Sequence, residues 1–319
     1  MFIGQRAATV QPAELEIKVG FIEEMRRHWM LYLMALPGIL ALLVFSYAPL
    51  FGLSVAFLDY NPVKGVLASK WVGSKNFTDA FNNPFFLAAL KNTVIIKGFQ
   101  TIIGFPSAII LALLLNEAGR WMKRLVQTST ILPYFISWVV IAAVFQTIFT
   151  PTNGIVNEVL QKVFKFKDPI LFLSDPAIFR WVIILQDTWK YAGYFAIIYL
   201  AAMARIDPTL YEAAMVDGAN RWQQILHVTL PGIRTTMVTM FILLSGYLIL
   251  GNFEQVFAQY SVSTYSTVDI LETFSWRMAI SQSRYGFATA VSLFQSVIAS
   301  TLVILTNWLV RYVEKEGLF

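Results

Sequence analysis

Long apolar runs, separated by shorter polar segments, set the pattern of this sequence. A helix needs about 20 predominantly apolar residues to cross the hydrocarbon core of a bilayer. Six runs of at least that length occur, over residues 31–56, 88–115, 125–149, 179–204, 235–257 and 289–313. The pattern therefore predicts an all-α integral membrane protein with six transmembrane helices.

The polar segments between the predicted spans differ in charge, which indicates how the chain is oriented. Lysine and arginine gather on one side: Arg26 and Arg27 precede the first span, Arg120, Lys123 and Arg124 lie between the second and third, Arg205, Arg221 and Arg234 flank the segment after the fourth, and Arg311 and Lys315 close the chain. Segments 58–85, 150–175 and 258–285 on the other side carry lysines balanced by acids. Basic residues concentrate in cytoplasmic loops, so both termini are predicted to be cytoplasmic.

Two regions follow from this topology. Residues 1–28 are predicted to form a cytoplasmic N-terminal tail, whose end either lies along the membrane interface as a helix or is a simple charged stop before the first span. Residues 29–319 are predicted to form the six-span domain, with a cytoplasmic segment, 205–234, between the fourth and fifth spans.

Composition supports the membrane assignment and removes other classes. Hydrophobic residues make up 57% of the chain and charged residues 13%, whereas soluble domains carry about 25% charged residues. Basic loops at a membrane surface explain the net charge of +5, so nucleic acid is not an expected partner. The chain has no cysteine, which excludes disulfides and thiolate metal sites.

The most ordered polar segment runs from Asp207 to Pro231 and reads DPTLYEAAMVDGANRWQQILHVTLP. Asp207 is a predicted helix cap, and Pro208 suits the first helical position. Gly218 allows the positive φ of a helix end. A second short helix is predicted to follow and to end at Leu230-Pro231. This helix–turn–helix presents small side chains outward, which lets another protein approach closely.

Three stretches of this segment, Glu212-Ala213-Ala214, Asp217-Gly218-Ala219 and Leu230-Pro231, resemble the EAA loop of permease subunits of bacterial ABC importers, of the sugar and oligosaccharide type. The resemblance implies that the loop is a coupling helix that sits in a groove of a separate ATPase subunit. The residues expected to couple the chain to the ATPase are Tyr211, Glu212, Ala213, Ala214, Asp217, Gly218, Ala219, Leu230 and Pro231. Many relatives carry a second proline four residues after the first, where this chain has Thr235.

The resemblance also implies a function and a set of partners. The chain is expected to be a permease subunit of an ATP-driven importer in the bacterial inner membrane, forming the pathway for a sugar, an oligosaccharide or an acidic polysaccharide. Its expected partners are a dimer of ATPase subunits that binds ATP and magnesium, a second permease subunit that is a different chain, an extracytoplasmic solute-binding protein, the saccharide itself and membrane lipid.

The sequence shows no nucleotide or catalytic site of its own. It contains no Gly-Lys dipeptide, and hence no phosphate-binding loop. Its histidines, His28 and His227, fall at the predicted cytoplasmic edge, so Ser245 has no histidine to activate it within the membrane. We therefore expect a non-catalytic subunit without cofactor or metal. Two other classes stay open: a stand-alone secondary transporter, for which an internal repeat would be typical and none is evident, and a non-transporting membrane scaffold.

Polar side chains within the predicted spans indicate a substrate pathway, because charges in a membrane face a cavity or a partner. The candidates are Lys97, Asp187, Trp189, Lys190, Tyr191, Tyr194, Tyr247, Asn252 and Glu254. Asp187, Lys190, Tyr191 and Tyr194 share one face of the fourth span. Aromatic faces beside hydrogen-bonding groups suit sugar rings. Lys97 and Lys190, both near the predicted midplane, favour an acidic saccharide such as a uronate polymer.

Each of these residues has a structural alternative that the sequence leaves open. Asp187 and Lys190 either face the pathway or form an internal ion pair, three residues apart on one helix. The tyrosines either contact the ligand or pack between helices. Glu254, predicted near the external rim, is either solvated or in contact with a binding protein.

Overall fold

Helix α2 (Trp29–Leu42) is the first long helix in the computed structural model, which describes residues 26–314. It continues through the π-helical turn η1 (Leu43–Tyr47) into the 3₁₀-helical η2 (Ala48–Phe57). The chain divides into two units, one ending at Leu53 and the other beginning at Ser54. The predicted tail, residues 1–28, lies outside the described residues except for its last three.

The described residues contain helices of the length and composition that a membrane protein requires. Trp29–Phe57, Pro84–Glu117 and Tyr285–Tyr312 are each long and apolar enough to cross a membrane. Two bent pairs, Arg120–Phe135 with Trp138–Phe149 and Arg221–Gly232 with Arg234–Leu248, raise the number of candidate spans to five if each pair is one span. The prediction of an all-helical membrane protein is thus confirmed, with three to five candidate spans.

Helix α8 (Pro176–Met203) has 28 residues but is not among these candidates. Its polar and charged residues, Gln186, Asp187 and Lys190 among them, lower its mean hydropathy. Much of α8 is instead buried within the protein, including Ile183, Gln186 and Lys190. Polar residues along a long helix are tolerated when protein rather than lipid surrounds them.

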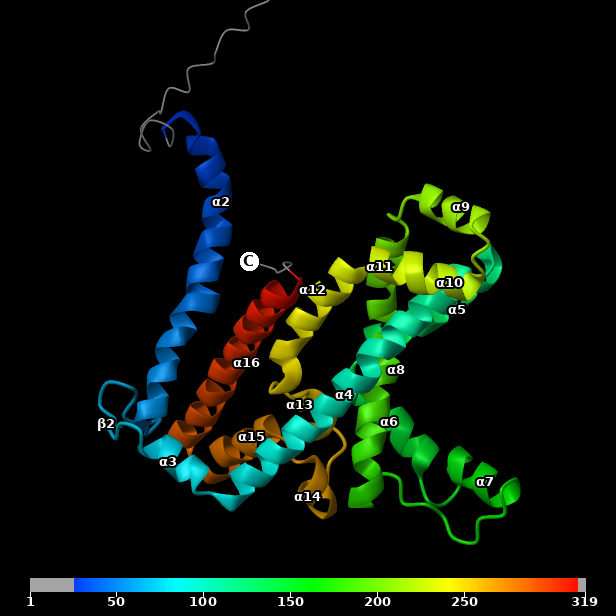
Figure 1. Ribbon diagram of the computed structural model, residues 1–319. Coiled ribbons are helices and arrows are strands. Elements are labelled where there is room, and N and C mark those ends of the chain that lie inside the picture. Colours follow the sequence, from blue (N-terminus) through cyan, green and yellow to red (C-terminus); the bar gives the residue numbers. More distant parts are fainter. Residues whose placement is uncertain (1–25, 315–319) are drawn as a thin grey trace, which may run out of the picture. The chain divides into compact units, whose positions relative to one another are not determined.

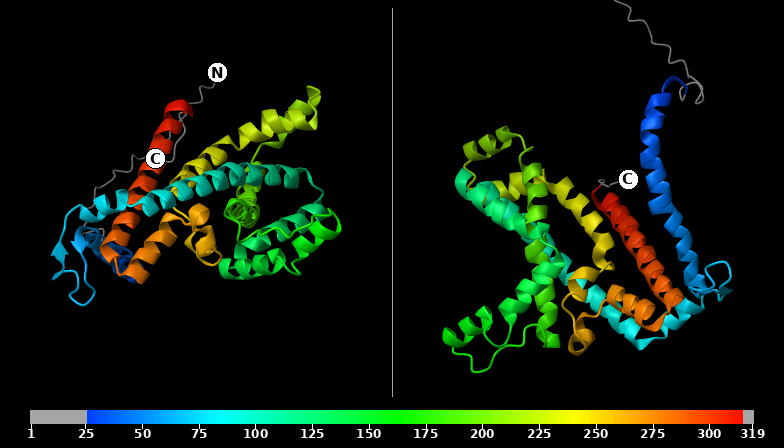
Figure 2. Two further views of the ribbon diagram at one scale, coloured as in Figure 1. Left: turned by 90° about the horizontal axis from the view of Figure 1, so that it is seen from below. Right: turned by 180° about the vertical axis from the view of Figure 1, so that it is seen from behind.

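The second unit is organised around the crossing of α4 (Pro84–Glu117) and α8. Figure 1 and the two views of Figure 2 show this crossing. Each helix begins with a proline after a capping residue: the Asn83 side chain accepts a hydrogen bond from the Phe85 N–H at 2.9 Å, and that of Asp175 accepts one from the Ala177 N–H at 2.8 Å. Small side chains allow close packing along these helices, with Ala112 buried completely. Around it lies a core that includes Ala108, Ala196, Tyr199 and Ile233.

The predicted third span is broken in the structure, which corrects the prediction of one continuous helix over 125–149. Helix α5 (Arg120–Ile131) is followed by the short 3₁₀ helix η3 (Leu132–Phe135), and α6 (Trp138–Phe149) then leaves at an angle of 106°. Pro133 lacks a backbone donor and so interrupts the helical hydrogen bonds. The Ser137 side chain starts α6 by accepting a hydrogen bond from the Val140 N–H.

The predicted fifth span, 235–257, is also interrupted. Helix α12 (Arg234–Ser245) continues into the short 3₁₀ helix η5 (Gly246–Leu248), after which residues 249–252 are not helical and α13 (Phe253–Phe257) begins. Gly251 lies in this non-helical segment, where a β-carbon would come within 2.3 Å of the Glu272 carboxylate. The Glu272 carboxylate thus occupies the space beside Gly251 that a side chain at this position would need.

The segments predicted as external loops contain short elements of their own. Segment 58–85 forms an antiparallel pair of strands, β1 (Leu58–Asp59) and β2 (Lys70–Trp71), with Leu58 opposite Trp71, and then α3 (Lys75–Phe81). Segment 150–175 contains α7 (Ile155–Lys162). Segment 258–285 contains η6 (Val262–Thr264), α14 (Tyr265–Val268) and α15 (Leu271–Gln282), and α15 packs on the last helix, α16 (Tyr285–Glu314), through Phe274 and Phe287.

Candidate functional site

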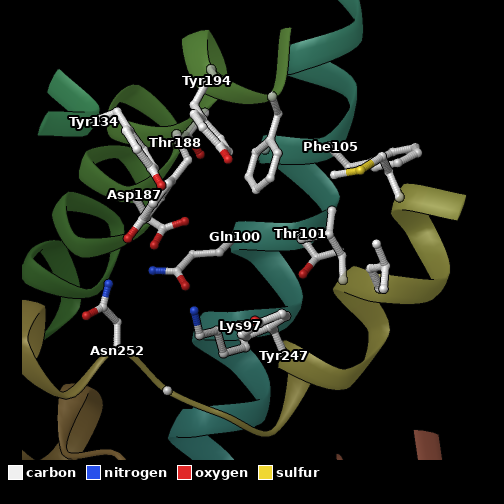
Figure 3. A pocket seen from close by; sticks show the side chains of 18 residues that line it. Lys97, Gln100, Thr101, Phe105, Tyr134, Asp187, Thr188, Tyr194, Tyr247 and Asn252 are labelled. Carbon is white, nitrogen blue, oxygen red and sulfur yellow. The ribbon is translucent and has the colours of Figure 1, made fainter. Parts of the chain in front are cut away.

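A cavity of 560 Å³ lies where α4, α8 and the broken fifth span meet, and Figure 3 shows the side chains that line it. Its polar lining comes from Lys97, Gln100 and Thr101 on α4, Asp187 and Thr188 on α8, and Asn252 before α13. The apolar and aromatic part of the wall comes from Phe105, Tyr134, Tyr191, Tyr194, Phe195, Met240, Leu243, Leu244 and Tyr247. The cavity therefore combines hydrogen-bonding groups with ring faces, a combination that binds polyhydroxylated rings.

Six of the nine residues predicted for the pathway line this cavity: Lys97, Asp187, Tyr191, Tyr194, Tyr247 and Asn252. The structure thus brings together residues from the predicted second, fourth and fifth spans. Trp189, Lys190 and Glu254 are not part of the lining. Trp189 is 48% exposed and lies beside Phe145, with ring centroids 5.9 Å apart, and Glu254 is exposed on α13.

Lys190 faces the break in the predicted third span rather than the cavity. Its ammonium donates hydrogen bonds to the backbone carbonyls of Pro133, at 3.0 Å, and Tyr134, at 3.1 Å, and also to that of Ile136. It also lies 5.2 Å from the centre of the Trp138 ring. The Pro133 carbonyl also accepts a hydrogen bond from the Ile136 N–H at 3.2 Å, and the ammonium adds a donor to each of the three carbonyls at the break.

The two charged residues of the lining, Lys97 and Asp187, come from facing helices and carry opposite charges. Lys97 is half-buried on α4, and Asp187 is half-buried on α8. Because the Lys190 ammonium is directed to carbonyls, Lys97 is the cation that the cavity presents to a ligand. The electrostatic field inside the cavity thus favours an anionic group near α4 and a hydroxyl donor near α8.

Two polar lining residues, Tyr134 and Gln100, were not among the residues predicted for the pathway. Tyr134 follows Pro133 in the break and stacks on Tyr194, with ring centroids 4.0 Å apart and planes 7° apart. Gln100 is buried on α4 and donates to Gln255 Oε1 at 3.4 Å. A proline in the middle of an apolar run was the sole hint of the break that brings Tyr134 into the wall.

Buried glutamines hold α13 against α8 behind the cavity. Gln186 Nε2 donates to Gln259 Oε1 at 2.9 Å, and Gln259 Nε2 donates to Gln186 Oε1 at 3.0 Å. Gln255 Nε2 donates to the Ile183 carbonyl at 2.7 Å. Paired amides satisfy one another in a region that water does not reach, so the second half of the fifth span is fixed to the fourth.

Glu272 supports the cavity from outside its lining. One carboxylate oxygen, Oε1, accepts hydrogen bonds from the Gly251 N–H and, at 3.0 Å, from Gln295 Nε2. The other, Oε2, is buried without a hydrogen-bond partner among the described residues. Burial raises the pKa of the Glu272 carboxyl, while its hydrogen bonds and the charge of Lys97 oppose that shift. The carboxyl thus fixes the backbone of the non-helical segment next to Asn252.

The second candidate site is the segment after α8, which forms a helix–turn–helix at one end of the second unit (Figure 1). Helix α9 (Pro208–Val216) begins after Asp207, whose side chain accepts a hydrogen bond from the Thr209 N–H at 2.9 Å. This bond lowers the pKa of the Asp207 carboxyl. The helix ends before Gly218, which has a φ of +78°. The predicted cap and turn are both confirmed.

The second helix of this segment runs further than predicted. It comprises α10 (Arg221–Gln224), the π-helical turn η4 (Ile225–Thr229) and α11 (Leu230–Gly232), so it passes Leu230-Pro231 before the 60° bend into α12. Pro231 lies at the start of α11, where its missing N–H is tolerated. Gly232 allows the close approach of Ile206, because a β-carbon there would lie 2.7 Å from Ile206 Cδ1.

The predicted coupling residues lie partly on the surface of this segment and partly within it. Those that are exposed are Glu212, Ala213, Asp217, Gly218 and Pro231, and those that are half-buried are Tyr211, Ala214, Ala219 and Leu230. The Tyr211 hydroxyl lies 3.0 Å from Thr229 Oγ1, and Gln224 Nε2 donates to the Ala219 carbonyl at 3.0 Å. These bonds tie the two helices into one rigid piece.

No residue of α9 is buried, so its surface is open to a partner. The apolar side chains of Leu210, Met215 and Val216 are 52%, 55% and 88% exposed. Exposed apolar groups beside small residues are typical of a protein-binding surface. Across residues 26–314, no three or more His, Cys, Asp or Glu side chains gather as a metal site requires.

Comparison with known proteins gives consistent results. The protein family described as "Binding-protein-dependent transport system inner membrane component" matches residues 104–316. The polygalacturonan/rhamnogalacturonan transport system permease protein YteP of Bacillus subtilis is 39% identical over 290 residues, covering 91% of this chain and 90% of that protein. One similar solved structure is the crystal structure of a bacterial alginate ABC transporter in complex with an alginate pentasaccharide-bound periplasmic protein. A chain of that structure is 36% identical to this chain and has a TM-score of 0.85, and the match covers 93% of this chain and 99% of the other. A second structure, of a bacterial ABC transporter that imports the acidic polysaccharide alginate, gives 37% identity and the same TM-score over 92% of this chain and 99% of its own.

Proposed function

Since this chain belongs to the family of inner membrane components of binding-protein-dependent transport systems, we propose that it forms the membrane pathway for an acidic oligosaccharide or polysaccharide. It is a multi-pass inner membrane permease of an ABC importer, and the permease is the non-catalytic component of such a transporter. The observation that carries the proposal is the cavity, where Lys97 lies among ring faces and amide groups.

The cavity suits a uronate in three respects. Tyr134, Tyr191 and Tyr194 offer ring faces on which the C–H faces of a sugar stack. Gln100 and Asn252 offer donors and acceptors for hydroxyl groups. The Lys97 ammonium pairs with a carboxylate. Asp187, opposite, accepts a hydrogen bond from a sugar hydroxyl. Relatives that carry polygalacturonan, rhamnogalacturonan or alginate support the same class.

We further propose six membrane crossings with both termini in the cytoplasm. The crossings are Trp29–Phe57, α4, the pair α5 and α6, α8, the broken span from α12 to α13, and α16. In this arrangement α8 is the fourth span, and its polar face is directed to the interior of the protein. The concentration of lysine and arginine near α9 and at the ends of the chain supports the orientation.

The helix–turn–helix from Asp207 to Pro231 is proposed to dock into a separate ATPase subunit on the cytoplasmic side. ATP and magnesium then bind to an ATPase dimer rather than to this chain. Because α8 leads from Asp187 in the cavity directly to Met203 and the α9 segment, movement of the docked segment is transmitted to the cavity wall. A second permease chain completes the pathway, and an extracytoplasmic binding protein delivers the saccharide, as the complexed alginate transporter supports.

The test of the substrate class is uptake by the complete transporter in proteoliposomes supplied with ATP. Lys97→Met is expected to lower uptake of a uronate oligosaccharide roughly tenfold, because it removes a charge-assisted bond. Uptake of a neutral oligosaccharide of equal length is expected to stay unchanged. Lys91→Met, at an exposed position of α4, is the matched control and is expected to behave as the unmodified protein. Equal uronate uptake by both variants contradicts the proposal.

The test of docking uses the absence of cysteine from the chain. An Ala213→Cys variant carries one thiol on α9, and a thiol-reactive cross-linker is expected to join it to the ATPase subunit. In sealed, right-side-out vesicles without the ATPase, a membrane-impermeant maleimide is expected to leave this thiol unlabelled. Labelling from outside would place α9 on the external face and reverse the proposed orientation.

A further inference from the structure

A second cavity, of 440 Å³, lies between α5 and α8 and shares no residue with the saccharide cavity. We call it the basic groove. Its cationic end is formed by Arg120, Lys123 and Arg124, and Gln127 and Thr128 follow along α5. At the far end Ile131 and Ile197 make it apolar. From Arg120 to Ile131 the groove thus extends about 16 Å along the helix, at 1.5 Å per residue, and changes from charged to polar to apolar.

Within residues 26–314, the three cations of the groove have no anionic partner. No ion pair or side-chain hydrogen bond joins Arg120, Lys123 or Arg124 to another of the described residues, 26–314. The nearest acid in the sequence, Glu117, is engaged instead with Arg221 at 3.5 Å. Arg120 and Arg124 are four residues apart on one helix, where like charges repel. A bound anion would relieve this repulsion.

The surroundings of the groove indicate an amphiphilic anion rather than a small soluble one. Trp121, Met122 and Leu125 lie on the same helix and are 74%, 51% and 47% exposed. Tryptophan is enriched at the level of lipid headgroups, and apolar side chains beside it suit acyl chains. A soluble phosphate would use only the cationic end and would leave Ile131 and Ile197 uncovered, whereas a lipid covers both ends.

We propose that the basic groove binds the headgroup of an anionic phospholipid, with the phosphate on Arg120, Lys123 and Arg124 and the start of an acyl chain along Ile131 and Ile197. This site is separate from the saccharide cavity and does not depend on the substrate. Because α5 leads into the break that carries Tyr134, lipid in the groove stabilises the part of the chain that positions one wall of the cavity.

The experiment is native mass spectrometry of the delipidated complete transporter, with phosphatidylglycerol or phosphatidylcholine added back. The unmodified protein is expected to retain phosphatidylglycerol in preference to phosphatidylcholine. Replacing Arg120, Lys123 and Arg124 together by Gln is expected to weaken phosphatidylglycerol retention by about fivefold for each charge removed. The matched control replaces Arg26, Arg27 and Arg311 by Gln and is expected to retain the lipid as the unmodified protein does.

A conservative variant separates loss of the site from loss of folding. Arg120→Lys combined with Arg124→Lys keeps the charge and is expected to retain phosphatidylglycerol. Equal phosphatidylglycerol retention by the triple variant and the unmodified transporter overturns the proposal. Loss of retention in both the triple variant and the control variant also overturns it. Release of the lipid by inorganic phosphate overturns the lipid assignment in favour of a soluble anion. None of these outcomes depends on saccharide uptake, so they leave the proposed transport function separately testable.

Discussion

The ring of Tyr134 lies parallel to that of Tyr194, with centroids 4.0 Å apart and planes 7° apart. Tyr134 comes from the 3₁₀ turn η3 in the broken third span, and Tyr194 comes from α8. Both rings line the saccharide cavity. The stack joins the two elements at the wall where a sugar ring would lie, so a change in the position of the break changes the shape of the site.

Truncation of this stack is predicted to impair binding more than folding. Tyr194 is partly exposed toward the cavity, so Tyr194→Ala leaves no closed void in a core. We expect the half-saturating saccharide concentration for uptake to rise roughly three- to tenfold, because one aromatic pair contributes about 0.5–1.5 kcal/mol. Tyr194→Phe keeps the ring and is expected to stay within about twofold of the unmodified protein. Equal effects of the two variants would assign the role to the hydroxyl instead.

Lys97 and Lys190, both predicted near the membrane midplane, are expected to differ sharply in their effect on the free energy of unfolding. Lys190 is 4% exposed and donates to the carbonyls of Pro133 and Tyr134. Lys190→Met removes the hydrogen bonds that these buried carbonyls accept from the ammonium, so the free energy of unfolding is expected to fall by about 2–4 kcal/mol. Lys97→Met, in the cavity lining, is expected to change it by less than about 1 kcal/mol.

Chemical unfolding of both variants in the same detergent measures this difference. Lys190→Arg retains a cation but has a larger, planar donor group, so it is expected to restore only part of the lost stability. The opposite result would be a Lys190→Met variant that is as stable as the unmodified protein but takes up less acidic saccharide. That result would indicate that Lys190 acts in the substrate pathway.

The stability of the segment behind the cavity is predicted to depend on pH through Glu272. This residue lies on α15, outside the predicted spans, and burial raises the pKa of its carboxyl. A raised pKa means that the folded protein keeps the proton to a higher pH than the unfolded chain does. The stabilisation is therefore present at low pH and is lost as the pH rises through the folded-state pKa.

Glu272→Gln removes this dependence because an amide does not ionise, while its oxygen still accepts from the Gly251 N–H. The apparent melting temperature of the variant, relative to the unmodified protein, is expected to rise as the pH increases through the raised pKa of the Glu272 carboxyl. Glu254→Gln, on the exposed side of α13, is the control, and the dependence on pH is expected to be larger for Glu272→Gln than for this variant. A constant difference for Glu272→Gln would show that the carboxyl does not change its charge over the pH range measured.

The helix–turn–helix at Asp207 could be predicted in detail because its determinants are local. An aspartate cap, a proline at the first helical position and a glycine with positive φ each act within a few residues. The Gly251 break could not, because the group that occupies its space is Glu272, 21 residues further along the chain. The role of Lys190 was open for the same reason: its acceptors lie 54 to 57 residues away.

The sequence by itself determined that this is a helical membrane protein, where its apolar runs lie and which segment forms the α9 turn, because hydrophobic length and helix caps depend on neighbouring residues. It also picked out the polar residues of the spans as a group. Tertiary structure alone decided which of them face a common cavity, since that depends on how far α4 and α8 cross and on where Pro133 bends the third span. Lys97 therefore lines the cavity, whereas Lys190 donates to backbone carbonyls at the break.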